Sequence, residues 1–131
     1  MKRIKMGSVE ILGYTGIFLW IAIILLRGIS LTNNSLYLFL LGILPNLAAA
    51  WAMTMFAKWV LLFILKRSVT VKIHFCICAA IIFLALISEV IHDMFLGSPF
   101  DIYDILITVV AQLFIFFIPM ATKDKYFNDY N

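Results

Sequence analysis

The third apolar segment of the chain, residues 73–92, decides the fold. It reads IHFCICAAIIFLALISEVIH, with Glu89 as its only acid and with no lysine or arginine. An α-helix rises 1.5 Å per residue, so a segment of this length crosses a hydrocarbon core of roughly 30 Å. The segment therefore predicts a transmembrane helix.

Three other segments of the same kind fill most of the chain, at residues 9–27, 36–65 and 99–120. Of the 131 residues, 65% are hydrophobic and only 13% are charged. A water-soluble domain of this composition would expose large apolar patches, whereas lipid accepts them without cost. We therefore expect an all-α integral membrane bundle of four transmembrane helices, formed by a single domain over residues 1–131.

The second segment is too long for a simple span. As one helix it would measure roughly 45 Å, against a core of roughly 30 Å. Pro45 lies inside it and removes one backbone donor. We expect either a long helix kinked near Pro45 or a short interfacial helix that ends near Gly42, and strong tilt is the competing explanation.

Basic residues predict the orientation, because they accumulate in cytoplasmic loops. Four crossings place these residues on one side: Lys2, Arg3, Lys5, Lys66, Arg67, Lys72, Lys123 and Lys125. Both termini would then lie in the cytoplasm, and residues 121–131 would form a polar cytoplasmic tail. The net charge of +3 is spread over these loops, which argues against a nucleic-acid partner.

Ionisable residues inside a membrane are costly and usually functional. Near the cytoplasmic side, Glu10 and Lys58 could pair, or Lys58 could extend to the interface beside Trp59. His74 is expected at the same interface. Cys76 and Cys78 are interpreted as small buried thiols, because C-x-C without further ligands is a weak metal signal.

A larger polar set lies toward the outer side: Arg27, Asn46, Glu89, His92, Asp93, Asp101, Asp104, Thr108 and Gln112. Glu89, His92 and Asp93 share one helix face by their spacing, and so do Asp101, Asp104, Thr108 and Gln112. Lipid cannot solvate such stripes, so they should face each other inside the bundle. The set predicts an outward-facing acidic pocket, which acts as a ligand site or as a polar network.

Part of this set has a plain structural interpretation. Ser98 fits an N-cap, Pro99 fits the first helical position, and Asp101 would then stand at the third position, close to the helix dipole. Glu89 and Asp104 lie deeper and are not explained by capping.

The stretch from Ser88 to Ile105 resembles the signature of VanZ-like membrane proteins. Glu89 and the run Phe100-Asp101-x-x-Asp104 match that signature in type and spacing. His92 stands at the position of its Gln, Thr108 at its Asn and Ala111 at its Gly. Ser98 lies near the position of its Arg, and Arg27 is hypothesised to replace that charge. Residues 44–46, Leu-Pro-Asn, resemble the start of the family's second conserved helix.

The resemblance implies a multi-pass protein of the bacterial cytoplasmic membrane, in a family whose founding member is linked to teicoplanin resistance. The first hypothesis is thus a non-enzymatic envelope protein that binds a lipid-type or glycopeptide-type ligand, or a membrane partner, which includes a second copy of the chain. A small proton-coupled or ion-coupled transporter is the second hypothesis, with Glu89, His92 and Asp104 as proton carriers. A metal-dependent membrane hydrolase is the third. No cofactor is predicted.

Overall fold

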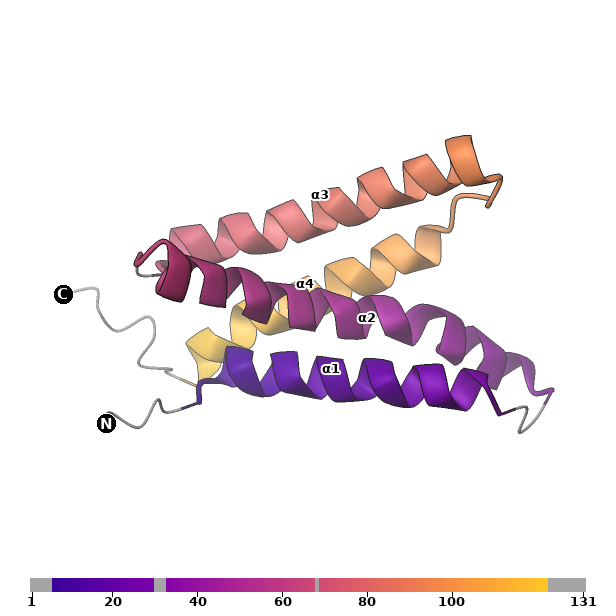
Figure 1. The fold of residues 1–131 in the computed structure, drawn as a ribbon, viewed down its shortest axis with the longest axis horizontal. Helices are drawn as coiled ribbons and strands as arrows, with labels where there is room; N and C mark the ends of the chain where they lie inside the picture. The colour runs from indigo at the N-terminus through magenta and orange to yellow at the C-terminus, as the bar shows by residue number, and fades with distance from the viewer. Residues whose placement is uncertain (1–5, 30–32, 68, 123–131) are drawn as a thin grey trace.

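The computed structural model describes residues 6–29, 33–67 and 69–122. Four α-helices follow one another along the chain: α1 (Ser8–Arg27), α2 (Ser35–Trp59), α3 (Val71–Leu96) and α4 (Ile102–Ala121). A π-helix, η1 (Val60–Ile64), continues α2. The expected all-α bundle of four helices is confirmed. Figure 1 shows the helices running back and forth, so that α1 begins and α4 ends on the same side of the molecule.

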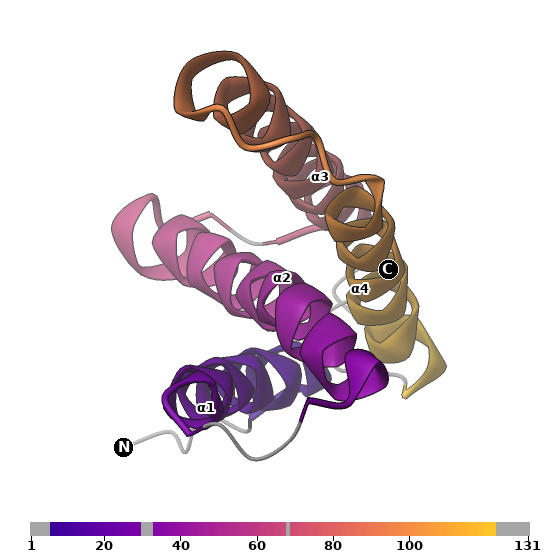
Figure 2. The same ribbon diagram turned by 90° about the vertical axis from the view of Figure 1, so that its right-hand side faces the viewer.

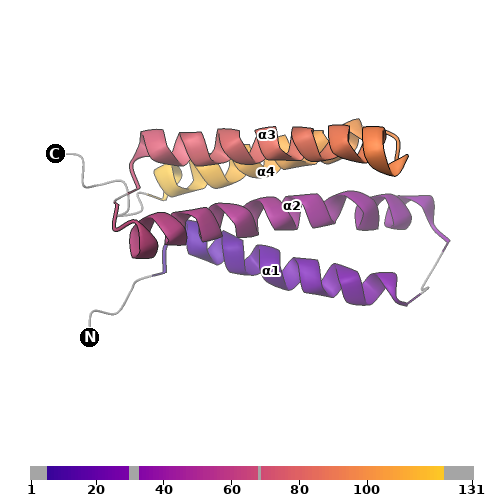
Figure 3. The ribbon, with the colours of Figure 1, turned by 45° about the horizontal axis from the view of Figure 1, so that its top comes forward.

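The order of the helices across the bundle is α1, α2, α4, α3. The view along the bundle in Figure 2 shows this order, and the contacts of α2 with α1 and α4 and of α3 with α4 agree with it. Figure 3 shows α3 lying over α4, and this pair resting on the pair formed by α1 and α2. The helices α2 and α4 thus form the centre of the bundle.

The two ends of the bundle differ in charge. We call the end where α1 begins and α4 finishes the basic end, because Lys66, Arg67 and Lys72 lie there. The opposite end, with the turn from α3 to α4, is the acidic end, because it carries Glu89, Asp93 and Asp101. The basic residues predicted at positions 2, 3, 5, 123 and 125, and the tail after residue 122, lie outside the described residues.

All four helical segments are long and apolar enough to cross a membrane. Their outward faces carry large exposed hydrophobic side chains such as Phe18, Phe56, Phe83 and Phe117. Exposed apolar surface on this scale is costly in water and favourable in lipid. The structure therefore fits a multi-pass membrane protein in contact with the bilayer.

The helix α2 runs through Pro45 without a break, and with η1 it forms a span of 30 residues. The long helix is thus the correct alternative, and the short interfacial helix ending near Gly42 is wrong. Pro45 has no N–H to give to the carbonyl of Leu41. The guanidinium of Arg27 donates two hydrogen bonds to that carbonyl, at 3.2 Å from Nε and 2.6 Å from the terminal nitrogen. Arg27 therefore restores what the proline removes.

The start of α4 differs from its prediction. Gly97 ends α3 in the left-handed conformation, with φ of 64°, and α4 begins only at Ile102. Asp101 is the N-cap, and its side chain accepts a hydrogen bond from the backbone N–H of Tyr103 at 2.9 Å. The expected cap at Ser98 and first position at Pro99 are wrong. A carboxylate in extended backbone satisfies the free N–H groups of the first turn, and this favours Asp101 as the cap.

Candidate functional site

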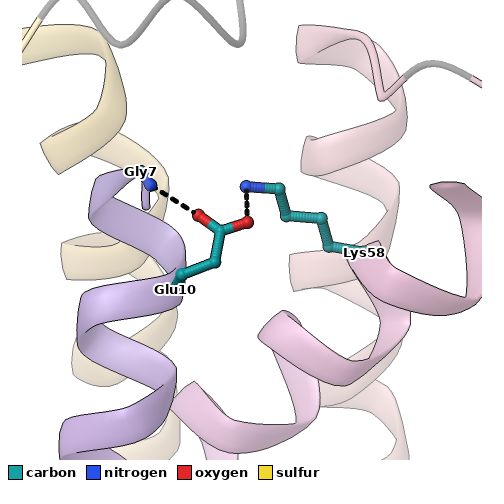
Figure 4. Close-up of polar contacts among 3 residues, drawn as sticks. All are labelled: Gly7, Glu10 and Lys58. Atoms are coloured by element: carbon teal, nitrogen blue, oxygen red, sulfur yellow. Dashed lines mark hydrogen bonds and ion pairs between the residues drawn. The ribbon is translucent and has the colours of Figure 1, made fainter. Parts of the chain in front are cut away.

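A buried ion pair joins α1 to α2 at the basic end. Lys58 Nζ lies 2.5 Å from Glu10 Oε1, and the two side chains are 1% and 11% exposed. The second carboxylate oxygen of Glu10 accepts a hydrogen bond from the backbone N–H of Gly7 at 3.0 Å, as Figure 4 shows. Of the two alternatives for Lys58, pairing is therefore the correct one, because the lysine turns into the bundle and not toward the interface.

His74 lies inside the bundle beside this pair. It is 1% exposed, its ring stacks on Phe116, and it is close enough to Lys58 for their charges to interact. Nε2 is 3.1 Å from the carbonyl oxygen of Ile115, and a carbonyl can only accept, so this nitrogen carries the proton. Ile115 precedes Pro119 by four residues, and its carbonyl is the one that this proline leaves without a helical donor. The sequence predicts His74 at the membrane interface; it lies on the first turn of α3, and its side chain is buried in the bundle.

The middle of the bundle contains a small hydrogen-bond network between α2 and α4. Gln112 donates from Nε2 to the carbonyl of Ala50 at 3.1 Å, and the Thr54 hydroxyl lies 3.2 Å from Gln112 Oε1 and 2.9 Å from the same carbonyl. Thr54 and Gln112 are 0% and 1% exposed. Trp51 adds a bond from Nε1 to the carbonyl of Ala111 at 3.0 Å. These bonds connect the two central helices where water is excluded.

At the acidic end, Glu89, Asp101 and Asp104 lie close enough for Asp104 to interact electrostatically with the other two acids. Glu89 on α3 accepts a hydrogen bond from the backbone N–H of Asp101 at 3.2 Å, so it holds the start of α4 against the end of α3. Asp104 lies within electrostatic range of both acids, and the side chain of Asn46 on α2 donates a hydrogen bond to it. We call Glu89, Asp101 and Asp104 the acidic cluster.

The other residues of the predicted pocket have different positions. His92 and Asp93 are exposed on the last turns of α3, which continues to Leu96. Thr108 is buried, and its hydroxyl donates to the carbonyl of Asp104 one turn earlier, at 2.8 Å. Arg27 acts on Asp104 electrostatically, but its hydrogen bonds go to Leu41. Most of the expected residues thus lie around Asp104, whereas His92 and Asp93 are exposed at the end of α3.

The two cysteines of α3 differ in exposure. Cys78 is buried in a cluster with Val9, Met55 and Ile115, whereas Cys76 is exposed on α3, contrary to expectation. Within residues 6–29, 33–67 and 69–122, no three His, Cys, Asp or Glu side chains are arranged to hold a metal ion. The acidic cluster can accept hydrogen bonds and attract cationic groups, which is a binding chemistry.

The sequence did not predict two buried polar contacts, namely that of Thr54 in the α2–α4 network and that of His74 with the Ile115 carbonyl. The sequence contains a pattern that indicates each of them. Asn46, Thr54 and Lys58 lie on one face of α2 at steps of eight and four, and His74 contacts the carbonyl freed by a proline in α4. Looking for a donor to match each proline would have pointed to His74 and to Arg27.

The geometry defines a four-helix membrane protein with a charged pair at one end and an acidic cluster at the other. Compared with protein-family models, curated proteins and solved structures, the chain shows no match.

Proposed function

We propose that this chain is a VanZ-like protein of the bacterial cytoplasmic membrane that binds a lipid-type or glycopeptide-type ligand at its acidic end. The observation that supports this most is the meeting of Glu89, Asp101 and Asp104. These acids are the residues by which the sequence resembles the VanZ-like signature. In the proposal the acidic end faces outward, where envelope lipids and glycopeptides are found.

The chemistry of the site suggests which group of the ligand it holds. Carboxylates in a partly desolvated position bind ammonium groups and other hydrogen-bond donors more strongly than exposed carboxylates do. Tyr103, which stands between Asp101 and Asp104 in the sequence, forms an edge-to-face pair with Phe39 of α2, with ring centroids 5.4 Å apart. Aromatic faces also attract cations. We therefore propose that a ligand ammonium group is the part recognised.

Binding to the purified protein tests the proposal. In a first experiment, the protein in nanodiscs is titrated with fluorescent teicoplanin. In a second, binding of phosphatidylethanolamine in the nanodisc is compared with binding of its N-acetylated form, which lacks the ammonium group. We expect binding of at least one ligand, and weaker binding in Glu89→Gln and Asp104→Asn. Asp93→Asn is the matched control, because Asp93 is an exposed acid at the same end of α3.

The outcomes separate cleanly. Loss in Glu89→Gln and Asp104→Asn with retention in Asp93→Asn supports the acidic cluster as the binding site. Equal binding in all variants, or no binding of either ligand by the unmodified protein, contradicts it. Circular dichroism of each variant confirms that the helices are intact, so that a loss of binding reports the site and not the fold.

A further inference from the structure

The basic end of the bundle carries cationic and apolar side chains next to each other. Lys66 and Arg67 follow η1, Lys72 stands on the first turn of α3, and all three are exposed. Large apolar side chains precede and follow these cations in the sequence, and each is more than half exposed: Phe63, Ile64, Leu65 and Phe75. We call these seven residues the basic-end patch. Figure 1 shows α2 ending and α3 starting together at this end of the bundle.

Hydrogen bonds and packing hold the backbone that presents the cations. The backbone N–H of Arg67 donates to the carbonyl of Leu61 at 2.9 Å. The Thr70 hydroxyl caps α3 by accepting from the backbone N–H of Ile73 at 3.1 Å. Val69 precedes this cap and is only 4% exposed. The cations on both sides of Val69 are therefore anchored to the bundle.

The three cations have no acidic partner within residues 6–29, 33–67 and 69–122. In that part of the chain, Glu10 is the acid at the basic end, and its two oxygens are taken by Lys58 and by the backbone N–H of Gly7. The other acids of the same ranges lie at the acidic end. Three positive charges at the basic end are thus available to an anion.

The backbone conformation of Lys66 is unusual for a lysine. Its φ is 49°, and among the described residues it is the only one other than glycine with a positive φ. Glycine and asparagine adopt this left-handed conformation most easily. The turn itself therefore does not explain a lysine at this position, whereas a contact made by its exposed ammonium group does.

We propose that the basic-end patch binds an anionic phospholipid of the adjacent leaflet. Lys66, Arg67 and Lys72 bind its phosphodiester, and its acyl chains lie along the exposed apolar side chains of the patch. Basic side chains at the ends of membrane helices attract anionic headgroups, and their apolar stems lie along the hydrocarbon boundary. The site is at the opposite end from the acidic cluster, so it does not depend on the ligand binding proposed above.

The apolar part of the patch selects a lipid over a free phosphate. Phe63, Ile64 and Leu65 come directly before the cations, and Phe75 lies one turn after Lys72. Exposed apolar side chains gain free energy in contact with acyl chains and gain nothing from a phosphate ion. The change from apolar to cationic residues occurs at the end of η1 and again at the start of α3, as expected at one membrane surface.

Lipid binding to the purified protein in detergent, measured by native mass spectrometry, tests the site. Phosphatidylglycerol and zwitterionic phosphatidylcholine with the same acyl chains are titrated separately. We expect a Kd for phosphatidylglycerol at least about tenfold lower than that for phosphatidylcholine. Lys66→Asn, Arg67→Gln and Lys72→Gln should each raise the Kd for phosphatidylglycerol about fivefold, the share of one basic residue near an anionic surface. The Kd for phosphatidylcholine should not change.

Lys66→Asn separates a role in lipid binding from a role in the turn. Asparagine suits the left-handed conformation, so thermal unfolding followed by circular dichroism should show a protein at least as stable as the unmodified one. Its affinity for phosphatidylglycerol should nevertheless fall. Unchanged affinity in Lys66→Asn, Arg67→Gln and Lys72→Gln overturns the proposal.

A matched control separates a site from general attraction by net charge. The three patch substitutions combined remove three positive charges, and so do Lys2→Gln, Arg3→Gln and Lys5→Gln combined. The preference for phosphatidylglycerol should be lost in the first triple variant and kept in the second. Equal loss in both triple variants overturns the proposal, and so does equal affinity of the unmodified protein for the two lipids.

Competition separates a lipid site from a phosphate site. At constant ionic strength, neither millimolar inorganic phosphate nor glycerophosphoglycerol, which is the headgroup without acyl chains, should displace phosphatidylglycerol. Displacement by either compound would show that the patch binds a free phosphate group, and it would overturn the assignment of a lipid.

Discussion

His74 donates a hydrogen bond from Nε2 to the carbonyl oxygen of Ile115 over 3.1 Å, and thereby satisfies an acceptor that Pro119 leaves open. Arg27 does the same for the Leu41 carbonyl, which Pro45 leaves open. In both cases the donor comes from the neighbouring helix of the same hairpin. The pair α1–α2 and the pair α3–α4 are therefore each joined by a side chain that donates to the carbonyl left open by a proline.

Removing His74 should destabilise the bundle, and the size of the loss should depend on Pro119. In His74→Phe the Ile115 carbonyl is left buried without a donor, which costs about 1–3 kcal/mol. In Pro119→Ala the backbone N–H returns, so adding His74→Phe should cost clearly less. Thermal unfolding in detergent, followed by circular dichroism, gives the double-mutant cycle. Additive losses would contradict the pairing.

Arg27 and Pro45 should show the same coupling. Arg27→Ala removes both donors from the Leu41 carbonyl, and Pro45→Ala supplies a backbone donor in their place. We expect a coupling of about 1 kcal/mol between the two changes, measured in the same unfolding assay. An equal loss of unfolding free energy on Arg27→Ala with Pro45 present and in the Pro45→Ala background would contradict this coupling. Arg27 would then act mainly on the acidic cluster, which is the role that the sequence suggests.

The ion pair at the basic end should behave as a unit. Lys58→Met alone leaves Glu10 buried without its partner, and such a change typically costs about 3–5 kcal/mol. Adding Glu10→Met to Lys58→Met should restore most of the stability, because an apolar pair needs no compensation. A double variant that is less stable than Lys58→Met would contradict this account of the pair.

Close helix contact at two glycines should be sensitive to added volume. A Cβ at Gly16 would lie 2.5 Å from the Ala48 carbonyl oxygen, and a Cβ at Gly13 would overlap the side chain of Met55. Gly16→Ala should therefore separate α1 from α2 and lower the unfolding temperature. Gly42→Ala is the control, because nothing lies within 4 Å of the new atom, and it should raise stability by about 0.5–1 kcal/mol.

Much of the fold could be predicted from the sequence, because hydrophobic length alone specifies a membrane helix. The predicted segments agree with the helices to within a few residues, and the larger errors lie where local chemistry decides. α4 begins at Ile102 because Asp101, rather than Ser98, caps it. α3 continues past His92 to Leu96 because Gly97 can adopt the left-handed conformation that ends a helix.

The acidic cluster could also be predicted, since Glu89, Asp101 and Asp104 are held together by a short turn between two helices. The buried polar network could not be predicted in full, because it depends on which faces of α2 and α4 meet. Thr54 forms one hydrogen bond with Gln112, which is 58 residues away in the chain. It forms another with the carbonyl of Ala50, one helical turn earlier. Sequence spacing gives the face of each helix, but not the partner of that face.

Labelling tests the proposed outward orientation of the acidic end. In a background with Cys76→Ser and Cys78→Ala, Ser98→Cys should react in intact cells with a maleimide that does not cross the membrane. Arg67→Cys, which is exposed at the basic end, should react only after the cells are permeabilised. The reverse pattern would place the acidic end in the cytoplasm and would contradict the proposed site of ligand binding.

The affinity of Asp104→Asn compared with that of Asp93→Asn tests the central claim most directly. Both changes remove one negative charge at the acidic end, but only Asp104 belongs to the acidic cluster. With the ligand that the unmodified protein binds, we predict that Kd rises about tenfold or more in Asp104→Asn and stays unchanged in Asp93→Asn. Equal Kd values for the two variants would contradict the claim that the acidic cluster is the binding site.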